Sequence, residues 1–177
     1  MEQLSNLETK NIKLREVEPE DLEILYKWEN DEKLWIYSNT LSPYSKFQIK
    51  SYIQNTLLDI YQTKQQRFMI DIKQTKQTIG TIDIFDIDFT NKRAGVGILI
   101  YEKKYRQKGY ATEALQIVIK YTKKILNLKQ LYCDILTDNN SSIKLFESQG
   151  FIISGEKKQW ILNNGKWKNQ YFLQKIL

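Results

Sequence analysis

A basic, glycine-containing segment at residues 103–112 carries the residues best suited to chemistry. Backbone N–H groups at the start of a helix have no partner within the helix, and the helix dipole is positive there, so such a loop binds anions. Gly109 lets a phosphate approach the backbone closely. Positive charge beside these amides comes from four side chains, Lys103, Lys104, Arg106 and Lys108. The segment predicts a pyrophosphate site, but it lacks the second glycine of a P-loop or of a G-x-G-x-x-G turn.

Two scarcities limit the remaining chemistry. The chain has no histidine, and Cys133 is its one cysteine. These counts exclude a Ser-His-Asp or Cys-His mechanism, a disulfide within the chain and a His/Cys zinc site, so we expect no metal. Cys133 is expected to be a buried strand residue, because nothing in the sequence would activate it as an acyl carrier.

The composition indicates one soluble domain. The chain has 177 residues and a net charge of +6, from 27 Lys and Arg against 21 Asp and Glu. The cations are spread along the chain and are mostly Lys, which is typical of a solubilising surface and argues against nucleic-acid binding. No apolar run approaches a membrane span, and a single thiol suits a reducing compartment, so we expect a cytoplasmic protein. Residues 1–10 are expected to be a polar extension, and residues 11–177 a single domain.

Changes in hydrophobic period predict the elements that must position the loop. We expect an α/β fold, an α+β sandwich with a mixed sheet flanked by helices. The expected strands are 12–17, 67–72, 78–87, 95–101 and 131–137, with a hairpin over 161–173 that turns at 163–165. The expected helices are 19–28, 47–60, 111–125 and 141–149. The loop at 103–112 therefore joins a buried strand to an amphipathic helix.

Two motifs resemble the GNAT superfamily of N-acetyltransferases. The pattern R-x-x-G-x-A at 106–111 resembles its acyl-CoA pyrophosphate loop, and residues 139–151 resemble its N-x-x-S-x-x-L-Y-x-x-x-G-F segment. The opening at 12–22 and the closing Asn-Gly-Lys-Trp at 164–167 look like the branch of spermidine and ribosomal-protein N-terminal acetyltransferases. The resemblance implies a mostly antiparallel sheet of about seven strands with about four helices, whose splayed central strand pair holds acyl-CoA.

The resemblance also implies a donor site for the cosubstrate acetyl-CoA. The pantetheine arm would pair with the fourth strand, and the pyrophosphate would bind the loop amides. The implied residues are Ile98, Leu99, Ile100, Arg106, Gln107, Lys108, Gly109, Tyr110, Ala111, Thr112, Asn139 and Lys144. Three of them have a second interpretation: Arg106 as a surface cation beside the loop, Asn139 as a helix N-cap, and Lys144 as a solvated side chain.

The implied reaction is direct attack of an amine on the thioester in a ternary complex. A primary amine is protonated near neutral pH, so a base must take its proton; without histidine, that base is a carboxylate, a tyrosine or water. The resemblance implies Asp83 and Asp86 as the candidates, because their strand borders the substrate cleft in the family and both stand where spermidine enzymes have an acid. Their spacing predicts that at most one points into the cleft; solvent-facing alternation is the other interpretation. Phe146 stands where many members of the family have a tyrosine that protonates the leaving thiolate, and a phenyl ring has no such proton to donate. Either CoA leaves as a thiolate, or Ser142, Tyr110 or water donates.

The acceptor pocket is expected from residues 29–45 and from the last hairpin. The candidates are Glu29, Trp35, Tyr37 and Tyr44, with core or lid packing as the alternative for the aromatic side chains. Leu41 and Ser42 stand where spermidine enzymes carry a glutamate pair, which argues against tight spermidine binding. The expected acceptor is a small amine or a peptide N-terminus, and the chain is a possible homo-oligomer. A second hypothesis is a CoA-binding sensor or interaction domain with weak or no catalysis.

Overall fold

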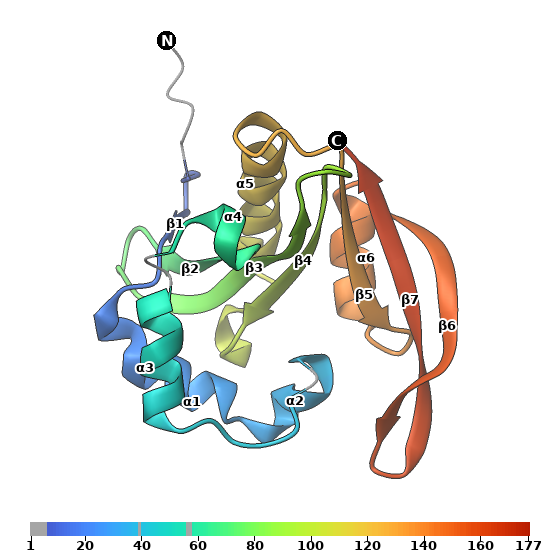
Figure 1. The fold of residues 1–177 in the computed structure, drawn as a ribbon, viewed down its shortest axis with the longest axis horizontal. Helices are drawn as coiled ribbons and strands as arrows, with labels where there is room; N and C mark the ends of the chain where they lie inside the picture. The colour runs from blue at the N-terminus through green and yellow to red at the C-terminus, as the bar shows by residue number, and fades with distance from the viewer. Residues whose placement is uncertain (1–6, 39, 56–57) are drawn as a thin grey trace.

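The computed structural model describes residues 7–38, 40–55 and 58–177. Within them, one sheet has the strand order β1-β2-β3-β4-β5-β7-β6 (Figure 1). Its strands are β1 (Ile12–Arg15), β2 (Gln66–Ile72), β3 (Thr78–Asp88), β4 (Arg93–Ile100), β5 (Gln130–Leu136), β6 (Ile152–Asn163) and β7 (Lys166–Ile176). This is the mixed, mostly antiparallel seven-stranded sheet that the resemblance implies, and that expectation is confirmed.

The centre of the sheet is splayed. β4 pairs with β3 along its length, but it pairs in parallel with β5 only from Arg93↔Gln130 to Gly95↔Tyr132. The remaining β4 residues, up to Ile100, therefore present an edge that β5 does not cover. All other neighbouring strands are antiparallel. The expected splayed strand pair is present.

Six α-helices occur in the described residues, where about four were expected. They are α1 (Leu22–Glu29), α2 (Glu32–Ser38), α3 (Lys46–Asn55), α4 (Ile60–Thr63), α5 (Tyr110–Lys124) and α6 (Asn140–Ser148). The excess lies before β2. The Asp59 side chain accepts from the amides of Tyr61 and Gln62 at 2.9 and 3.0 Å, so α4 begins separately from α3.

Helices cover both faces of the sheet. The larger core lies between the sheet and the helices α5 and α6, with Ala114, Leu115 and Val118 fully buried. A smaller core lies on the opposite face, where Leu25 and Trp28 of α1 pack with α3 against Met69. Consequently the loop before α5 and the segments around α1 reach the splayed strands from opposite sides of the sheet.

The last hairpin is longer than expected. β6 and β7 are joined by the two residues Asn164 and Gly165, at φ 48° and 73°, which is the type I′ geometry that Asn-Gly favours. β6 already begins at Ile152, because it is an edge strand exposed along most of its length and shows no alternation to predict it. The hairpin extends past the end of β5 (Figure 1).

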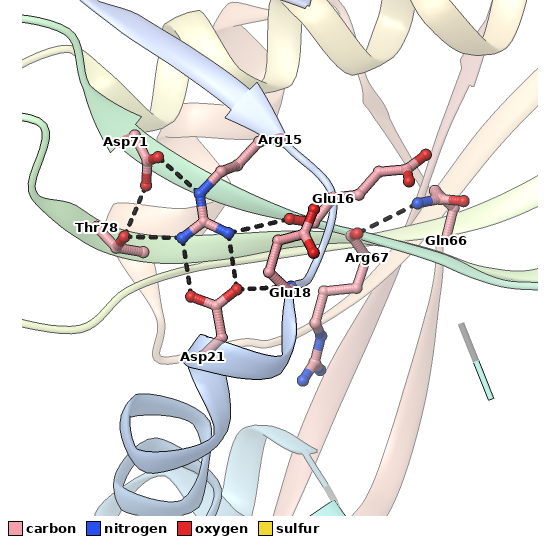
Figure 2. A network of polar contacts seen from close by, with 8 residues as sticks. All are labelled: Arg15, Glu16, Glu18, Asp21, Gln66, Arg67, Asp71 and Thr78. Atoms are coloured by element: carbon pink, nitrogen blue, oxygen red, sulfur yellow. Dashed lines mark hydrogen bonds and ion pairs between the residues drawn. The ribbon is translucent and has the colours of Figure 1, made fainter. Parts of the chain in front are cut away.

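An arginine network fixes the first strand to its neighbours. Figure 2 shows the Arg15 guanidinium between Asp21 and Asp71, at 2.7 and 2.8 Å, with Thr78 at 3.2 Å. The hydrogen bond to Asp21 is the main reason that the pKa of Arg15 lies above its ordinary value. Asp21 also accepts from the Glu18 amide at 2.9 Å, so one buried carboxylate links β1 to the turn that begins α1. The Arg67 guanidinium, in the same view, lies apart from this network, and it pairs instead with Glu29 and Asp83.

Candidate active site

A cleft of about 1020 Å³ lies where β4 and β5 part. β4 from Val96 to Ile100 forms one wall, and β5 from Cys133 to Leu136 forms the other. The lining also includes the loop before α5, the first residues of α5 and α6, and residues of α1, α2, α3, β2, β3 and β7. Residues of five strands and five α-helices of the described chain, from both faces of the sheet, thus line one cavity.

The loop before α5 opens onto this cleft. Gly109 has φ 85°, a left-handed conformation that favours glycine, and a Cβ there would meet nothing within 4 Å. The first intrahelical bond of α5 runs from the Glu113 amide to the Gly109 carbonyl at 3.0 Å. The amides of Tyr110, Ala111 and Thr112 precede that bond, so they have no acceptor within the helix. Open backbone and unpaired donors are what a bound pyrophosphate requires, and the residues present fit this group.

Arg106 is tied to the end of β4. Its Nε donates to the Ile100 carbonyl at 2.9 Å, and its Nη2 donates to the Tyr101 carbonyl at 2.8 Å. These bonds fix the loop relative to the strand edge along which a pantetheine arm would lie. The structure therefore gives Arg106 a role in holding the loop in place, and the cleft lining includes it with Gln107.

The start of α6, which follows β5, also lines the cleft. Asn139 is its N-cap, with Oδ1 accepting from the Ser142 amide at 3.3 Å. Ser142 and the exposed Lys144 line the cleft. Phe146 lines it too, but its ring is 3% exposed and packs edge-on against Phe151 at 5.0 Å between centroids. A residue that packs in this way contributes to the core and has no proton to donate.

Asp83 lines the cleft within a charged cluster. Its two oxygens accept from Nε and Nη2 of Arg67 at 2.6 and 3.1 Å, while Nη1 of Arg67 donates to Glu29 at 2.5 Å. The guanidinium lies over the Tyr52 ring at 5.3 Å. Burial lowers the pKa of Arg67, but Asp83, Tyr52 and Glu29 outweigh this effect and raise it well above its ordinary value. The cluster is a fixed arrangement of two carboxylates and one permanent cation.

Asp83 lines the cleft and Asp86 does not, which agrees with the expectation that at most one of them would. The expected alternation of faces fails at Asp86 itself, for a physical reason. β3 has a bulge there, with Asp86 at φ 49°, so Ile84 and Ile87 are both buried on the larger core. Asp86 turns toward Tyr132, where burial and then the Asp86 carboxylate raise the pKa of the Tyr132 hydroxyl. It lines a second pocket of about 460 Å³.

The four acceptor-pocket candidates separate into two pairs. Glu29 and Tyr37 line the cleft. Trp35 lies outside its lining, since its Nε1 donates to the Glu29 carbonyl at 2.9 Å and holds α2 against α1. Tyr44 lies outside it as well, because its backbone is bound to Asn30 at 2.7 and 3.0 Å. The alternative interpretation, packing between elements, describes Trp35, whereas the Tyr44 side chain is exposed.

Sequence reasoning missed Arg67. The residue is opposite Asp83 in the β2–β3 register, and a charged pair at directly opposed positions is a cross-strand signal. The register was not predictable, because it shifts between Ile70 and Asp71. Cys133, by contrast, is buried as expected, and burial raises the pKa of its thiol. That shift disfavours the thiolate and therefore an acyl-cysteine step.

Comparison with known proteins decides the family. The profile of the acetyltransferase (GNAT) domain matches residues 11–152. The chain belongs to the GNAT acetyltransferase family. It is 28% identical to spermidine N(1)-acetyltransferase of Escherichia coli strain K12, over 90% of this chain and 82% of that protein. It is 30% identical to an uncharacterised N-acetyltransferase, p20, of Bacillus licheniformis, over 95% and 94% of the two chains.

A solved structure shares the fold. Spermidine N-acetyltransferase from Vibrio cholerae, in complex with CoA and spermine, superposes with a TM-score of 0.83 at 23% identity, covering 95% of this chain and 96% of that one. This GNAT protein is thus an N-acetyltransferase, which moves an acetyl group to an amine. None of the described helices is both long and apolar enough to cross a membrane. No metal-binding group of three or more Asp, Glu, Cys or His side chains is found in the described part of the chain.

Proposed function

We propose that this GNAT protein transfers the acetyl group of acetyl-CoA to a primary amine of a small molecule or of a peptide N-terminus. The observation that carries the proposal is the anion-binding loop at 106–112, which opens onto the cleft between β4 and β5. The names of the similar proteins, spermidine N-acetyltransferases of Escherichia coli and Vibrio cholerae, support a small cationic amine as the acceptor.

The donor would lie along β4. Its pyrophosphate would bind the amides of residues 107–112, and its pantetheine arm would pair with the edge of Ile98, Leu99 and Ile100, as an added strand does. Asn139 would hydrogen-bond the arm through the amide nitrogen that its capping bond leaves available. The exposed Lys144, which lines the cleft, would pair with a phosphate. This binding places the thioester near the middle of β4.

Proton transfer would rely on Asp83. In the cluster with Arg67 and Glu29, the two carboxylates outnumber the cation, so the cluster attracts an ammonium group. Asp83 would receive the amine's proton directly or through one water molecule. CoA would leave as a thiolate, which a thiol pKa of about 8.5 tolerates, with Ser142 as the nearby hydroxyl donor.

The test is an acetyl-transfer assay with the purified full chain. Acetyl-CoA is mixed with spermidine, lysine, an aminoglycoside or a short peptide, and thiol release is followed. Release that depends on one class of amine is the expected result. If no amine gives release while CoA still raises the melting temperature, the chain is a CoA-binding module and the proposed reaction is refuted.

We also propose that residues 11–177 act as one domain in the cytoplasm. Two residues before position 11 also contact this domain: Leu7 packs on the larger core, and the Thr9 hydroxyl donates to Glu113 of α5. A single buried thiol suits a reducing compartment.

A further inference from the structure

Gly97 is a glycine that the fold itself does not require. It lies within β4 and lines the cleft, and its φ lies outside the left-handed region. A Cβ at this position would meet only the ring of Phe85, at 3.7 Å, which is an ordinary van der Waals distance. Glycine weakens the interior of a strand, so an alanine here would fit and would favour the strand. The bare backbone therefore points to something outside the chain that uses the space.

Two other glycines of the sheet differ in this respect. A Cβ on Gly80 would lie 1.9 Å from the Leu99 carbonyl oxygen, and a Cβ on Gly95 would lie 2.2 Å from the Phe85 ring. Packing therefore requires both. Gly95 in particular makes room for Phe85, whose ring lies across it and meets Tyr132 edge-on at 6.1 Å between centroids. Phe85 is thus held in place at the last point where β4 and β5 still pair.

The open position has charged and aromatic neighbours. Arg67, Asp83 and Gly97 are directly opposed on β2, β3 and β4, so they form one row on one face of the sheet. Phe85 is two residues beyond Asp83 on the same face. The space over Gly97 is therefore bounded by a carboxylate that Arg67 holds and by the face or edge of an aromatic ring. The carboxylate attracts an ammonium group, and the ring of Phe85 limits the width of the space beside it.

We propose that Phe85 and Gly97 are specificity-determining residues, which together form a narrow slot beside Asp83 for a primary ammonium on an unbranched carbon chain. The inference rests on the proposed function and narrows its acceptor class. The unbranched chain would itself fill the room that Gly97 leaves open. A methyl branch on the carbon that bears the nitrogen would then have no space. Diamines, polyamines and lysine side chains fit this description, whereas the branched α-carbon of a peptide N-terminus does not.

The first test is Gly97→Ala, with Gly155→Ala as the matched control. Gly155 also lies in a strand, its φ lies outside the left-handed region, and a Cβ there meets nothing within 4 Å, far from the cleft. We expect Gly97→Ala to keep the melting temperature and the acetyl-CoA Kd. Its kcat/KM for 1,5-diaminopentane should fall at least about tenfold, as one misplaced methyl group does in a fitted pocket. Gly155→Ala should match the wild type.

The second test is Phe85→Ala, assayed with 1,5-diaminopentane and with a branched amine such as 2-aminopentane. Opening the slot should raise the kcat/KM ratio of the branched to the unbranched amine at least about tenfold. The proposal is overturned if wild-type protein prefers the branched amine or if Gly97→Ala acetylates as the wild type does. Should Phe85→Ala not fold, Gly97→Ala decides alone. A wild type that acetylates no amine would refute the proposed function, and the slot with it.

Discussion

Replacing Gly109 by aspartate tests the loop on which the donor site depends. The substitution adds a negative charge beside the amides of residues 110–112, where the pyrophosphate would bind. Sterically it is mild, because a Cβ at Gly109 meets nothing within 4 Å. Its φ of 85° does strain any L-residue, by about 1–2 kcal/mol, although aspartate tolerates this region better than most. Charge repulsion and strain must therefore be separated.

The size of the repulsion follows from Coulomb's law. Two unit charges about 6 Å apart, at the effective dielectric of about 20 that suits a protein surface, repel by about 3 kcal/mol. That energy corresponds to about a 100-fold loss of affinity for each phosphate charge within reach. The loop is exposed, so salt screening reduces the effect of the second charge. We expect the Kd for CoA to rise at least about 100-fold at low salt.

The assay is isothermal titration of CoA into the full chain, with Gly165→Asp as the control. Gly165 has φ 73° and open space around its Cβ, but it lies in the β6–β7 turn, away from the cleft. This control carries the same strain and the same added charge. Binding by Gly109→Asp within about threefold of the control would refute the phosphate-loop assignment.

Three further outcomes follow from buried groups. Arg15→Ala leaves the buried Asp21 carboxylate without its ion pair, so the free energy of unfolding in urea should fall by about 3 kcal/mol, while the Kd for CoA stays unchanged. A fall of less than about 1 kcal/mol would contradict a stabilising role for this network. Phe146→Tyr should raise kcat about tenfold near neutral pH, and less above the thiol pKa, if its hydroxyl protonates the leaving thiolate; an unchanged pH–rate profile rejects that role. Burial raises the pKa of the Cys133 thiol in the folded chain. The contribution of this thiol to the free energy of unfolding is therefore complete below the ordinary thiol pKa and decreases as the pH rises above that ordinary value. Iodoacetamide should accordingly label native protein far more slowly than urea-unfolded protein, and equal rates would contradict the burial.

Much of the fold was readable because its central elements have strong periods. The apolar run at 95–101 predicted β4, and the amphipathic stretch at 111–125 predicted α5 to within one residue. The region before β2 was harder to predict. Local caps such as Asp59 divide it into short helices, and hydrophobic spacing alone does not show where one helix ends and the next begins. β6 was predicted short for a related reason: both of its faces are exposed, so there is no buried set to alternate with.

The site was less predictable than the fold, because its side chains depend on register. The loop at 106–112 could be read directly, since a helix start binds anions through backbone groups whatever the tertiary context. Asp86 and Arg67 could not. A one-residue bulge turned Asp86 away from the larger core, which it would face by simple alternation, and the strand register brought Arg67 opposite Asp83. Period-2 reasoning assigns faces correctly only until the first bulge.

The absence of histidine gives the Arg67 cluster its significance. The proposed reaction needs a group that accepts a proton from an ammonium and a group that stabilises the departing thiolate, and Phe146 supplies neither. Asp83 is the carboxylate that the cleft offers on β3, and both of its oxygens are held by Arg67. A carboxylate held in this way has a fixed position from which to orient an ammonium group. Removal of the proton from that ammonium should limit the rate at low pH. The rate should therefore rise with pH as more of the free amine is present, and the protein's main contribution is the placement of amine and thioester across Gly97.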